Sequence, residues 1–319
     1  MGTDNPLIAI LMAVYQPRLD WLREQLLSLN AQTYPNLRLY VRDDSSPTVP
    51  FETIQALVGE CITVFPYTIQ RNEKNLGSNG TFERLTREAE GEYFAYCDQD
   101  DVWLPEKLTL LAQEIKKTGA GLVCTDVIPI DGDGREIGSS IRDFRPRHIF
   151  HSGSGLAPQL IYRNFVIGCT MLIRAEVARE ALPFAKSMVH DHYLAFACAT
   201  RNKLAVCDVP LVRYRLHEDN QTLVLAKIQD KRGYVERHML PFCQRVEELS
   251  ARYEVPELRR AAEWAEARRA NASRQPGGVR AMLRSGGVNR PTTLFEVVGL
   301  RLPGPLFRFA LKLIQQGRI

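Results

Sequence analysis

The sequence lacks the features that mark membrane-spanning and secreted chains. Its apolar runs fall short of the roughly 18 residues that a membrane-spanning helix needs, and the run at residues 7–14 is only as long as a strand. The start of the chain shows no basic region followed by a hydrophobic signal core. We therefore expect a protein that stays on the side of the membrane where it is made, in the cytoplasm.

An excess of positive charge is also lacking. Lys and Arg number 41 against 37 Asp and Glu, which leaves a net charge of +4. That excess is too small to indicate nucleic acid as a partner. The chain also lacks paired cysteines: its seven cysteines are odd in number, irregularly spaced and never arranged as CxxC. This pattern favours reduced, buried thiols over a disulfide frame or a zinc site.

The composition is that of an ordinary globular protein. The 319 residues are 45% hydrophobic and 24% charged, which excludes the fully disordered and collagen-like classes. A chain of this length suits one large domain, or one domain with an appendage.

Strand and helix patterns alternate along the first third of the chain. The apolar run at residues 7–14 is typical of a strand buried on both faces. The predicted elements that follow are a helix at 20–32, a strand at 37–41, a helix at 51–60, a strand at 62–69, a helix at 78–90 and a strand at 93–97. This order predicts a doubly wound, mostly parallel α/β sheet, in which ligands bind beyond the carboxyl ends of the strands.

The rest of the chain is less regular. Its predicted elements are a helix at 103–117, strands at 121–130 and 165–173, a helix at 190–200 and a strand at 204–214. After residue 222 the chain is rich in Arg and Glu and is predicted to be helical. Residues 271–293 are rich in Gly, Ser, Pro and Arg, and we expect a linker there.

The strongest chemical signal is an acidic run, Asp98-Gln99-Asp100-Asp101, directly after a predicted buried strand. Three carboxylates so close together repel one another, and burial raises the cost. A divalent cation would remove that conflict, and oxygen ligands suit Mg²⁺ or Mn²⁺, which commonly bridge to substrate phosphates. The alternative is a solvated acidic turn in which Asp101 caps the next helix.

Two further polar elements fall at predicted strand ends. Asp43 and Asp44 follow the strand at 37–41, where a carboxylate can accept a hydrogen bond from a base or a ribose. Asn75-Leu76-Gly77 opens a predicted helix, where backbone N–H groups can meet a phosphate or hold a nucleoside. A capped turn and a plain turn are the alternatives.

Two histidine-containing segments complete the set. His190 and Asp191 begin an apolar predicted helix, and Asp191 is either its N-cap or a functional carboxylate. His217 follows the last predicted strand and is either a metal ligand or a surface residue.

Taken in this order, over residues 6–220, these elements resemble the family 2 glycosyltransferases with the GT-A fold. The matching segments are residues 13–17 (first strand and its exit), 43–46 (the DD-S element), 75–77 (the N-x-G turn), 98–101 (the DxD metal motif), 164–170 (the acceptor-side strand) and 190–191 (the ED motif). His190 stands where the family usually has an acidic residue. The subtype resembles bacterial rhamnosyltransferase-like members that build surface polysaccharide.

The resemblance implies an inverting, metal-dependent transferase that uses Mg²⁺ or Mn²⁺. Its donor would be a nucleotide sugar, dTDP-rhamnose or a UDP-sugar, and its acceptor a glycan or a lipid-linked glycan. The domains implied are a GT-A catalytic domain at 1–222, with a nucleotide-binding half to about 102 and an acceptor half at 103–222, and a helical region at 223–319.

The resemblance also assigns roles to residues. Asp191 would be the general base. Nucleotide contacts would come from Val14, Tyr15, Asp44, Asn75, Gly77, Asp98 and Gln99, with Asp43 as a helper. The metal would be held by Asp98, Asp100 and His217, with Asp101 in support, and the acceptor by Trp103, Gly168, Cys169 and His190.

Two other functions, a sugar nucleotidyltransferase and a non-catalytic scaffold, are alternatives to this one. A sugar nucleotidyltransferase needs a Gly-rich, basic loop after the first strand to hold a triphosphate, and residues 15–20 contain no glycine. In a non-catalytic scaffold that only binds a nucleotide sugar, we would expect the metal-binding carboxylates or the base carboxylate to be lost. This sequence has both the metal-binding carboxylates and the base carboxylate.

The C-terminal tail has an apolar face made of Phe307, Ala310, Leu311 and Ile314, with Arg308 and Lys312 elsewhere. Such a helix can lie in a membrane interface, here the cytoplasmic face of the inner membrane, where a lipid-linked acceptor would be found. The alternative is a helix that packs on the catalytic domain.

Overall fold

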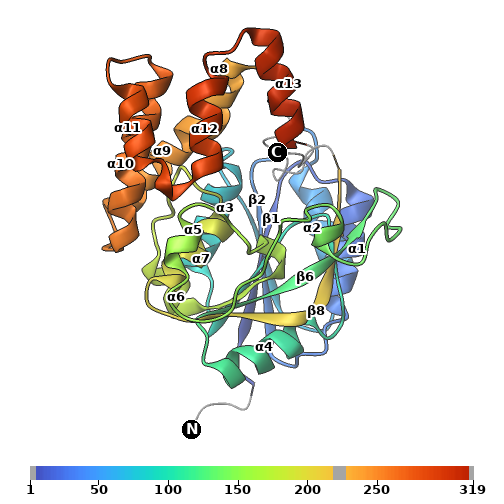
Figure 1. The fold of residues 1–319 in the computed structure, drawn as a ribbon. Helices are drawn as coiled ribbons and strands as arrows, with labels where there is room; N and C mark the ends of the chain where they lie inside the picture. The colour runs from blue at the N-terminus through green and yellow to red at the C-terminus, as the bar shows by residue number, and fades with distance from the viewer. Residues whose placement is uncertain (1–4, 218–227, 316–319) are drawn as a thin grey trace. The chain divides into compact units, whose positions relative to one another are not determined.

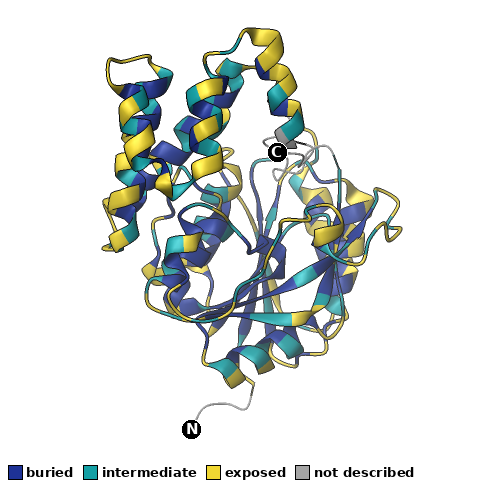
Figure 2. Ribbon diagram, in the orientation of Figure 1, coloured by how far each residue is buried: buried dark blue, intermediate teal, exposed yellow. Residues whose placement is uncertain are grey.

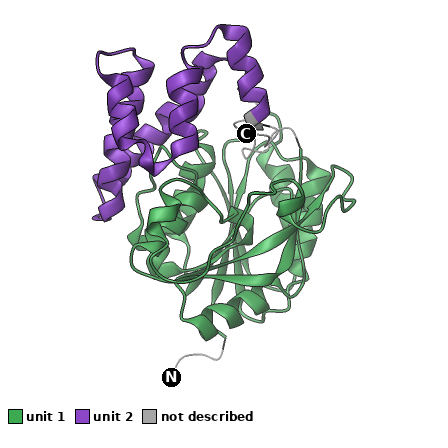
Figure 3. Ribbon diagram, in the orientation of Figure 1, with its two compact units in different colours: residues 1–218 green, residues 219–319 purple. Residues whose placement is uncertain are grey.

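The computed structural model describes residues 5–217 and 228–315 (Figure 1). The chain divides into two compact units, residues 1–218 and 219–319 (Figure 3). The predicted domain boundary at residue 222 falls at 218–227, outside the described residues. The division of the catalytic domain near residue 102 stays a prediction.

Unit 1 is built on an eight-stranded sheet with the order β3-β2-β1-β4-β7-β6-β8-β5. Strands β1 to β4 run parallel to one another, as do β6 and β8, while β7 is antiparallel to β4 and β6 and β5 is antiparallel to β8. The predicted mostly parallel α/β fold is therefore confirmed. The strands are β1 (Ile8–Val14), β2 (Leu37–Asp43), β3 (Tyr67–Arg71), β4 (Tyr93–Cys97), β5 (Val102–Trp103), β6 (Leu122–Ile130), β7 (Leu172–Arg174) and β8 (Leu204–Arg215).

Helices cover both faces of this sheet (Figure 1). On one face, alternate residues of β1 (Ile8, Ile10, Met12 and Val14) share a buried apolar cluster with α1, α2 and α4, as the two-residue period of a strand requires. On the other face, α3 packs with α6 and α7. The helices are α1 (Leu19–Asn30), α2 (Phe51–Cys61), α3 (Gly77–Glu88), α4 (Lys107–Thr118), α5 (Ala157–Leu160), α6 (Ala175–Glu180) and α7 (His190–Ala199).

Three predicted elements of unit 1 differ in the structure. The strand predicted at 62–69 lies later in the chain, at Tyr67–Arg71. The predicted strand at 165–173 is mostly irregular: a 3-10 turn at Gly168–Thr170 precedes the three-residue strand β7. The predicted helix at 103–117 begins only at Lys107, because Val102 and Trp103 pair with β8.

The register of the parallel strands brings their ends to one edge of the sheet. Val14 at the end of β1 pairs with Asp43, Asp43 pairs with Arg71 at the end of β3, and Cys97 pairs with Met12. The segments after these four strands therefore lie side by side, as the ligand-binding edge of a doubly wound sheet requires.

Unit 2 is helical, as predicted after residue 222. Its helices are α8 (Lys231–Tyr234), which continues through a π-turn (Val235–Met239) into α9 (Leu240–Ser250), then α10 (Pro256–Ala272), α11 (Gly278–Ser285), α12 (Arg290–Gly299) and α13 (Gly304–Gln315).

The expected linker at 271–293 is wrong, because α11 and the start of α12 fill it. Its glycines allow close packing: a Cβ at Gly278 would lie 2.8 Å from the Ala270 backbone, and one at Gly286 would lie 2.4 Å from Thr293.

The membrane face expected of the tail is also corrected. Phe307 and Leu311 are buried within unit 2, where the Phe307 ring contacts Tyr234 and Phe295. This face is occupied by helices of its own unit and is not open to lipid; the side chain of Ile314 lies outside the described ones. Among the helices in the described ranges, none has both the length and the apolar character needed to cross a bilayer.

A buried ion pair joins α10 to α12. Arg268 and Glu296 are 2% and 0% exposed, and Arg268 Nη2 lies 2.5 Å from Glu296 Oε1. The Tyr234 hydroxyl donates to the same oxygen at 2.9 Å. Removing one partner of such a pair leaves the other charge buried without compensation.

We expect Glu296→Gln to lower the free energy of unfolding by about 3–5 kcal/mol, because the Arg268 charge stays buried. Urea unfolding followed by far-UV circular dichroism measures this. The control is Glu263→Gln, which removes the exposed partner of Arg259 and should cost at most about 1 kcal/mol. Equal effects of the two changes would contradict the assignment.

Candidate functional site

The acidic run forms the loop between β4 and β5. All five residues of β4 are buried, and the chain then turns through Asp98, Gln99, Asp100 and Asp101. Asp100 Oδ2 lies 2.9 Å from Nε2 of His217, and Asp101 Oδ1 accepts from the backbone N–H of Arg215 at 3.0 Å. The predicted neighbours Asp100 and His217 are thus brought together although 117 positions separate them.

Burial and like charge both act on these carboxylates. Burial raises the pKa of Asp98 well above its usual range, and the charges of Asp100 and Asp101 raise it further. Burial, followed by the charge of Asp100, raises the pKa of Asp101 to about 7. The loop therefore holds carboxylates whose ionisation is opposed by burial and by one another's charge, which is the electrostatic condition of a cation site.

The residues present fit a divalent cation. Asp98, Asp101 and Cys169 offer ligand atoms within 4.8 Å of one another. Asp101 Oδ2 is buried with no nitrogen or oxygen partner. Burial raises the pKa of the Cys169 thiol well above its usual range, so the sulfur stays protonated and the carboxylates are the better ligands.

Sequence reasoning missed two basic residues that support this loop. Lys107, the first residue of α4, is fully buried; its Nζ lies over the Trp103 ring and donates to the Cys169 carbonyl at 2.6 Å. Arg215, at the end of β8, donates from Nε to the Asp100 carbonyl at 2.8 Å and pairs with Glu24. Neither has a sequence signal of its own, because each element contains other charged residues, such as Glu114 in α4 and Arg213 in β8.

The loop is also joined to the end of β1. The Gln99 side chain accepts from the backbone N–H of Tyr15 at 2.8 Å and donates to its carbonyl at 3.0 Å. The Tyr15 ring is 44% exposed and is free to contact a base. Val14 is buried and its carbonyl accepts from Asp44 N–H at 2.7 Å, so Val14 positions its neighbours.

Asp44 holds the Asn75–Gly77 turn. Its Oδ1 accepts from Asn72 Nδ2 at 2.8 Å and from the Leu76 N–H at 2.7 Å, and its Oδ2 accepts from the Gly77 N–H at 2.8 Å. Gly77 has a φ of +73°, a backbone conformation that favours glycine. The oxygens of Asp44 are therefore mostly occupied by the turn, so the structure gives Asp44 the role of fixing the turn, and its predicted contact with a nucleotide stays a prediction.

Asp43 is similarly engaged and fully buried. Its Oδ1 accepts from the backbone N–H of Ser46 at 3.1 Å and from the Ser46 hydroxyl at 2.5 Å, and Arg71 Nε lies 3.2 Å from its Oδ2. Ser45 next to it has a φ of +61°, which is uncommon outside glycine. The structure gives Asp43 the role of fixing this strained turn.

Asp191 lies in the first turn of α7. The N-cap of that helix is Val189, so the interpretation of Asp191 as the N-cap is wrong. Its Oδ2 accepts from the Gly168 N–H at 3.0 Å and its Oδ1 from Asn164 Nδ2 at 3.2 Å. Burial raises its pKa to about 6, against the lowering effect of these hydrogen bonds. Its charge in turn raises the pKa of Asp98, so the two carboxylates lie close enough to interact electrostatically.

The four predicted acceptor residues are all buried. Gly168 and His190 lie beside Asp191: a Cβ at position 168 would lie 2.8 Å from His190 Nε2. The His190 ring packs between Phe82 and Tyr96, and burial lowers its pKa to about 3, so it is neutral. Trp103 and Cys169 belong to the apolar core, and the assignment of all four residues to acceptor binding stays a prediction.

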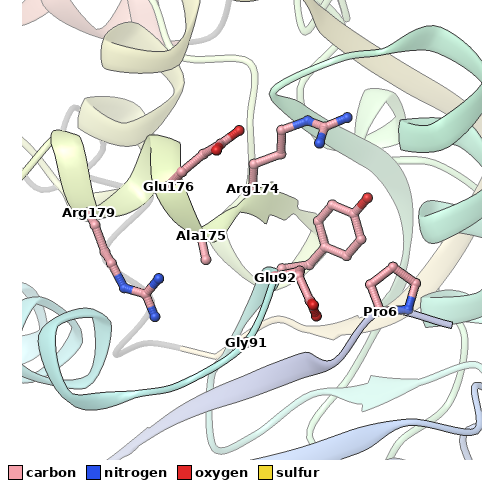
Figure 4. A pocket seen from close by; sticks show the side chains of 8 residues that line it. Pro6, Gly91, Glu92, Arg174, Ala175, Glu176 and Arg179 are labelled. Atoms are coloured by element: carbon pink, nitrogen blue, oxygen red, sulfur yellow. The ribbon is translucent and has the colours of Figure 1, made fainter. Parts of the chain in front are cut away.

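A pocket of about 380 Å³ lies elsewhere in unit 1 (Figure 4). It is lined by residues at the start of β4 and the end of β7, among them Glu92, Tyr93 and Arg174. Because β7 runs antiparallel to β4, this is the edge of the sheet opposite the acidic loop. The pocket is therefore not part of the candidate site.

Residues 9–182, more than half of the chain, match the model of the family described as "Glycosyl transferase family 2". The chain is similar to an uncharacterised glycosyltransferase of Rickettsia felis, at 26% identity over 67% of the chain and 35% of that protein. It is also similar to the dTDP-rhamnosyl transferase RfbG of Shigella flexneri, at 26% identity over 67% of the chain and 74% of that protein. The chain thus spans about a third of the Rickettsia relative and three quarters of RfbG.

Two solved structures share the fold. S. aureus TarS (residues 1–349), in complex with UDP-GlcNAc, has a TM-score of 0.63 at 17% identity, and the match covers 97% of this chain and 92% of that one. A mannosyltransferase from Pyrobaculum calidifontis, in complex with GDP-Man and Mn²⁺, has a TM-score of 0.58 at 14% identity and covers 94% and 83%. At these identities the likeness concerns the fold alone.

We expect Asp44→Ala to weaken binding of UDP or dTDP, measured by calorimetry with Mn²⁺ present. The change removes the acceptor of the Leu76 N–H and one of the two acceptors of the Gly77 N–H, a loss of about 1–3 kcal/mol that opens the turn. Asp208→Ala, an exposed carboxylate on β8, is the control and should bind as the parent does. Undiminished binding by Asp44→Ala would remove this turn from the nucleotide site.

Proposed function

Because this chain belongs to glycosyl transferase family 2, we propose that it transfers a sugar from a nucleotide-diphosphate donor to a hydroxyl group, with inversion at the anomeric carbon. The observation that carries the proposal is the pairing of two sets of carboxylates in one site. The acidic loop after β4 supplies one set, and Asp191 on α7 supplies the other, close enough for its charge to raise the pKa of Asp98.

The two sets have different chemical tasks. A divalent cation bound by Asp98, together with Asp100, Asp101 or His217, would act as a Lewis acid on the leaving diphosphate. Asp191 accepts the proton of the attacking hydroxyl as the new bond forms. A carboxylate of pKa about 6 is ionised at neutral pH and is still basic enough to share that proton. Gly168 and Asn164 hold it in place through their hydrogen bonds to its two oxygens.

The nucleotide would lie over the ends of β1 to β3. The exposed Tyr15 ring, on a backbone that is hydrogen-bonded to Gln99, can contact the base. The Asn75–Gly77 turn, whose Leu76 and Gly77 N–H groups Asp44 holds, can line the same side of the nucleotide at the start of α3. The likeness to RfbG supports dTDP-rhamnose as donor, and the likeness to TarS supports a UDP-sugar. We propose a glycan or lipid-linked acceptor, used in surface polysaccharide synthesis at the cytoplasmic face of the membrane.

The alternatives receive less support. A sugar nucleotidyltransferase would need a phosphate-binding loop after β1, where Gln16 instead uses its side chain to accept from Thr48 N–H at 3.1 Å. A non-catalytic scaffold would have no reason to keep a buried Asp101 oxygen without a partner beside Asp98.

We expect donor turnover to need a divalent metal. Release of nucleoside diphosphate from dTDP-rhamnose and UDP-GlcNAc should be abolished by excess EDTA and restored by Mn²⁺ or Mg²⁺, since the carboxylates of the loop repel a diphosphate without one. Asp98→Asn should lower turnover by at least about a hundredfold even with saturating Mn²⁺. Full turnover in EDTA would be incompatible with metal dependence.

We expect Asp191→Asn to keep the fold and nucleotide binding but to lower turnover by roughly 10²–10⁴-fold. In the parent protein at saturating Mn²⁺, kcat should rise with pH and reach half its maximum near pH 6, because the base works only when ionised. That acidic limb should be absent from the residual rate of the variant.

Asn164→Ala is a matched variant, since it removes one hydrogen bond that lowers the pKa of Asp191. It should move the acidic limb to higher pH. Near-normal turnover by Asp191→Asn, or a product with the donor's anomeric configuration, would reject the mechanism.

A further inference from the structure

The last two helices of unit 2, α12 and α13, carry several exposed apolar side chains. Among the described residues, eight aliphatic or aromatic side chains are exposed by half or more, and five of them fall between 283 and 309. These five are Leu283, Leu294, Val298, Leu306 and Phe309, and Phe309 is 64% exposed. Figure 2 shows exposed stretches along α12 and α13.

The same stretch carries exposed charge of only one sign. From residue 278 to the end, the sequence has seven basic residues and a single acidic one, Glu296. Glu296 is fully buried and paired with Arg268. The basic residues that the structure describes here are all exposed: Arg280, Arg284, Arg290, Arg301, Arg308 and Lys312.

Helical geometry sorts these residues into faces on α13. At 100° per residue, Phe307 and Leu311 point into unit 2, while Leu306 and Phe309 share a separate exposed face. Arg308 and Lys312, four residues apart, form a basic strip next to that exposed face. The helix is therefore apolar on two sides, and only one of them is covered by the fold.

Helix α12 repeats the arrangement. Leu294 and Val298 are exposed one turn apart, with Arg290 one turn before them and Arg301 just after the helix. The buried side of α12 contains Thr293 and Glu296, which face Trp264 and Arg268 of α10. The exposed apolar pair is therefore not needed for the packing of unit 2.

We propose that the exposed apolar residues Leu294, Val298, Leu306 and Phe309, with the basic residues beside them, dock on an anionic lipid surface. Apolar side chains flanked by Lys and Arg suit the boundary between acyl chains and anionic headgroups. A second copy of the chain is a poorer occupant, because two such faces would bring basic residues together with no exposed acid. Nucleic acid would use the charge but would leave the apolar groups in water.

This docking is independent of the chemistry proposed above and is tested on the full-length protein without substrate. Flotation with phosphatidylglycerol-containing vesicles should carry the protein upward, and vesicles of phosphatidylcholine alone should not. Leu306→Ser/Phe309→Ser should lower the partition coefficient by at least about tenfold. Arg308→Ser/Lys312→Ser should lower it by about 25-fold, at about fivefold for each basic residue.

Controls of equal exposure lie in unit 1. Val64→Ser replaces a side chain that is also 64% exposed, and Lys117→Ser replaces a basic residue on α4 that is 76% exposed. Both should partition as the parent does, and thermal unfolding should show that all variants are folded.

Three outcomes overturn the proposal: equal binding to neutral vesicles, loss of binding in the controls as great as in the α13 variants, or no vesicle binding. If light scattering shows a dimer that Phe309→Ser dissociates, these residues bind a second copy of the chain instead. If the protein retains a random-sequence RNA and does not bind vesicles, they belong to a nucleic-acid site instead.

Discussion

The site depends on how the protein holds negative charge at the buried end of β4. Asp98 and Asp101 lie where desolvation and mutual repulsion both oppose ionisation. Two buried basic residues from distant parts of the chain lie around them: Lys107, whose pKa burial lowers to about 7, opens α4, and Arg215 ends β8. Because neither residue is on β4, the geometry of the loop depends on how α4 and β8 pack against it.

At the ends of β1 and β2, where we propose that the nucleotide binds, buried carboxylates hold the turns in shape. Asp43 and Asp44 are buried and spend their oxygens on the backbone N–H groups of two turns. Such carboxylates fix the shape of loops that have no regular structure of their own, at a strand edge where Ser45 and Gln16 both have positive φ. The exposed groups left at this edge, such as the Tyr15 ring, are then placed by a rigid support.

The sequence predicted the parts of this molecule that local pattern determines. Apolar runs gave β1, β2 and β4, and the short motif at 98–101 gave the acidic loop, because both signals are contiguous. Lys107 and Arg215 could not be recognised, since a charged residue in a helix or strand is normally exposed and only the assembled fold buries these two. The prediction of a linker at 271–293 is wrong because it rested on local composition. Glycines such as Gly278 and Gly286 are typical of linkers, but here they allow close contacts between helices. The apolar periodicity of the tail correctly predicted a helix with an apolar face, but the sequence could not show that other helices of unit 2 would bury that face.

The contact between Gly168 and His190 limits how the surroundings of Asp191 can be altered. Any side chain at position 168 would meet the imidazole at 2.8 Å, and that ring is confined by Phe82 and Tyr96. Gly168 also supplies the N–H that orients Asp191, so a shift there would displace the carboxylate as well. Positions 168 and 190 are therefore coupled. A library that changes one residue at a time would find position 168 intolerant, because His190 stays in place. A smaller residue at 190 combined with Ala or Ser at 168 would relieve the contact, which the change at 168 cannot do alone.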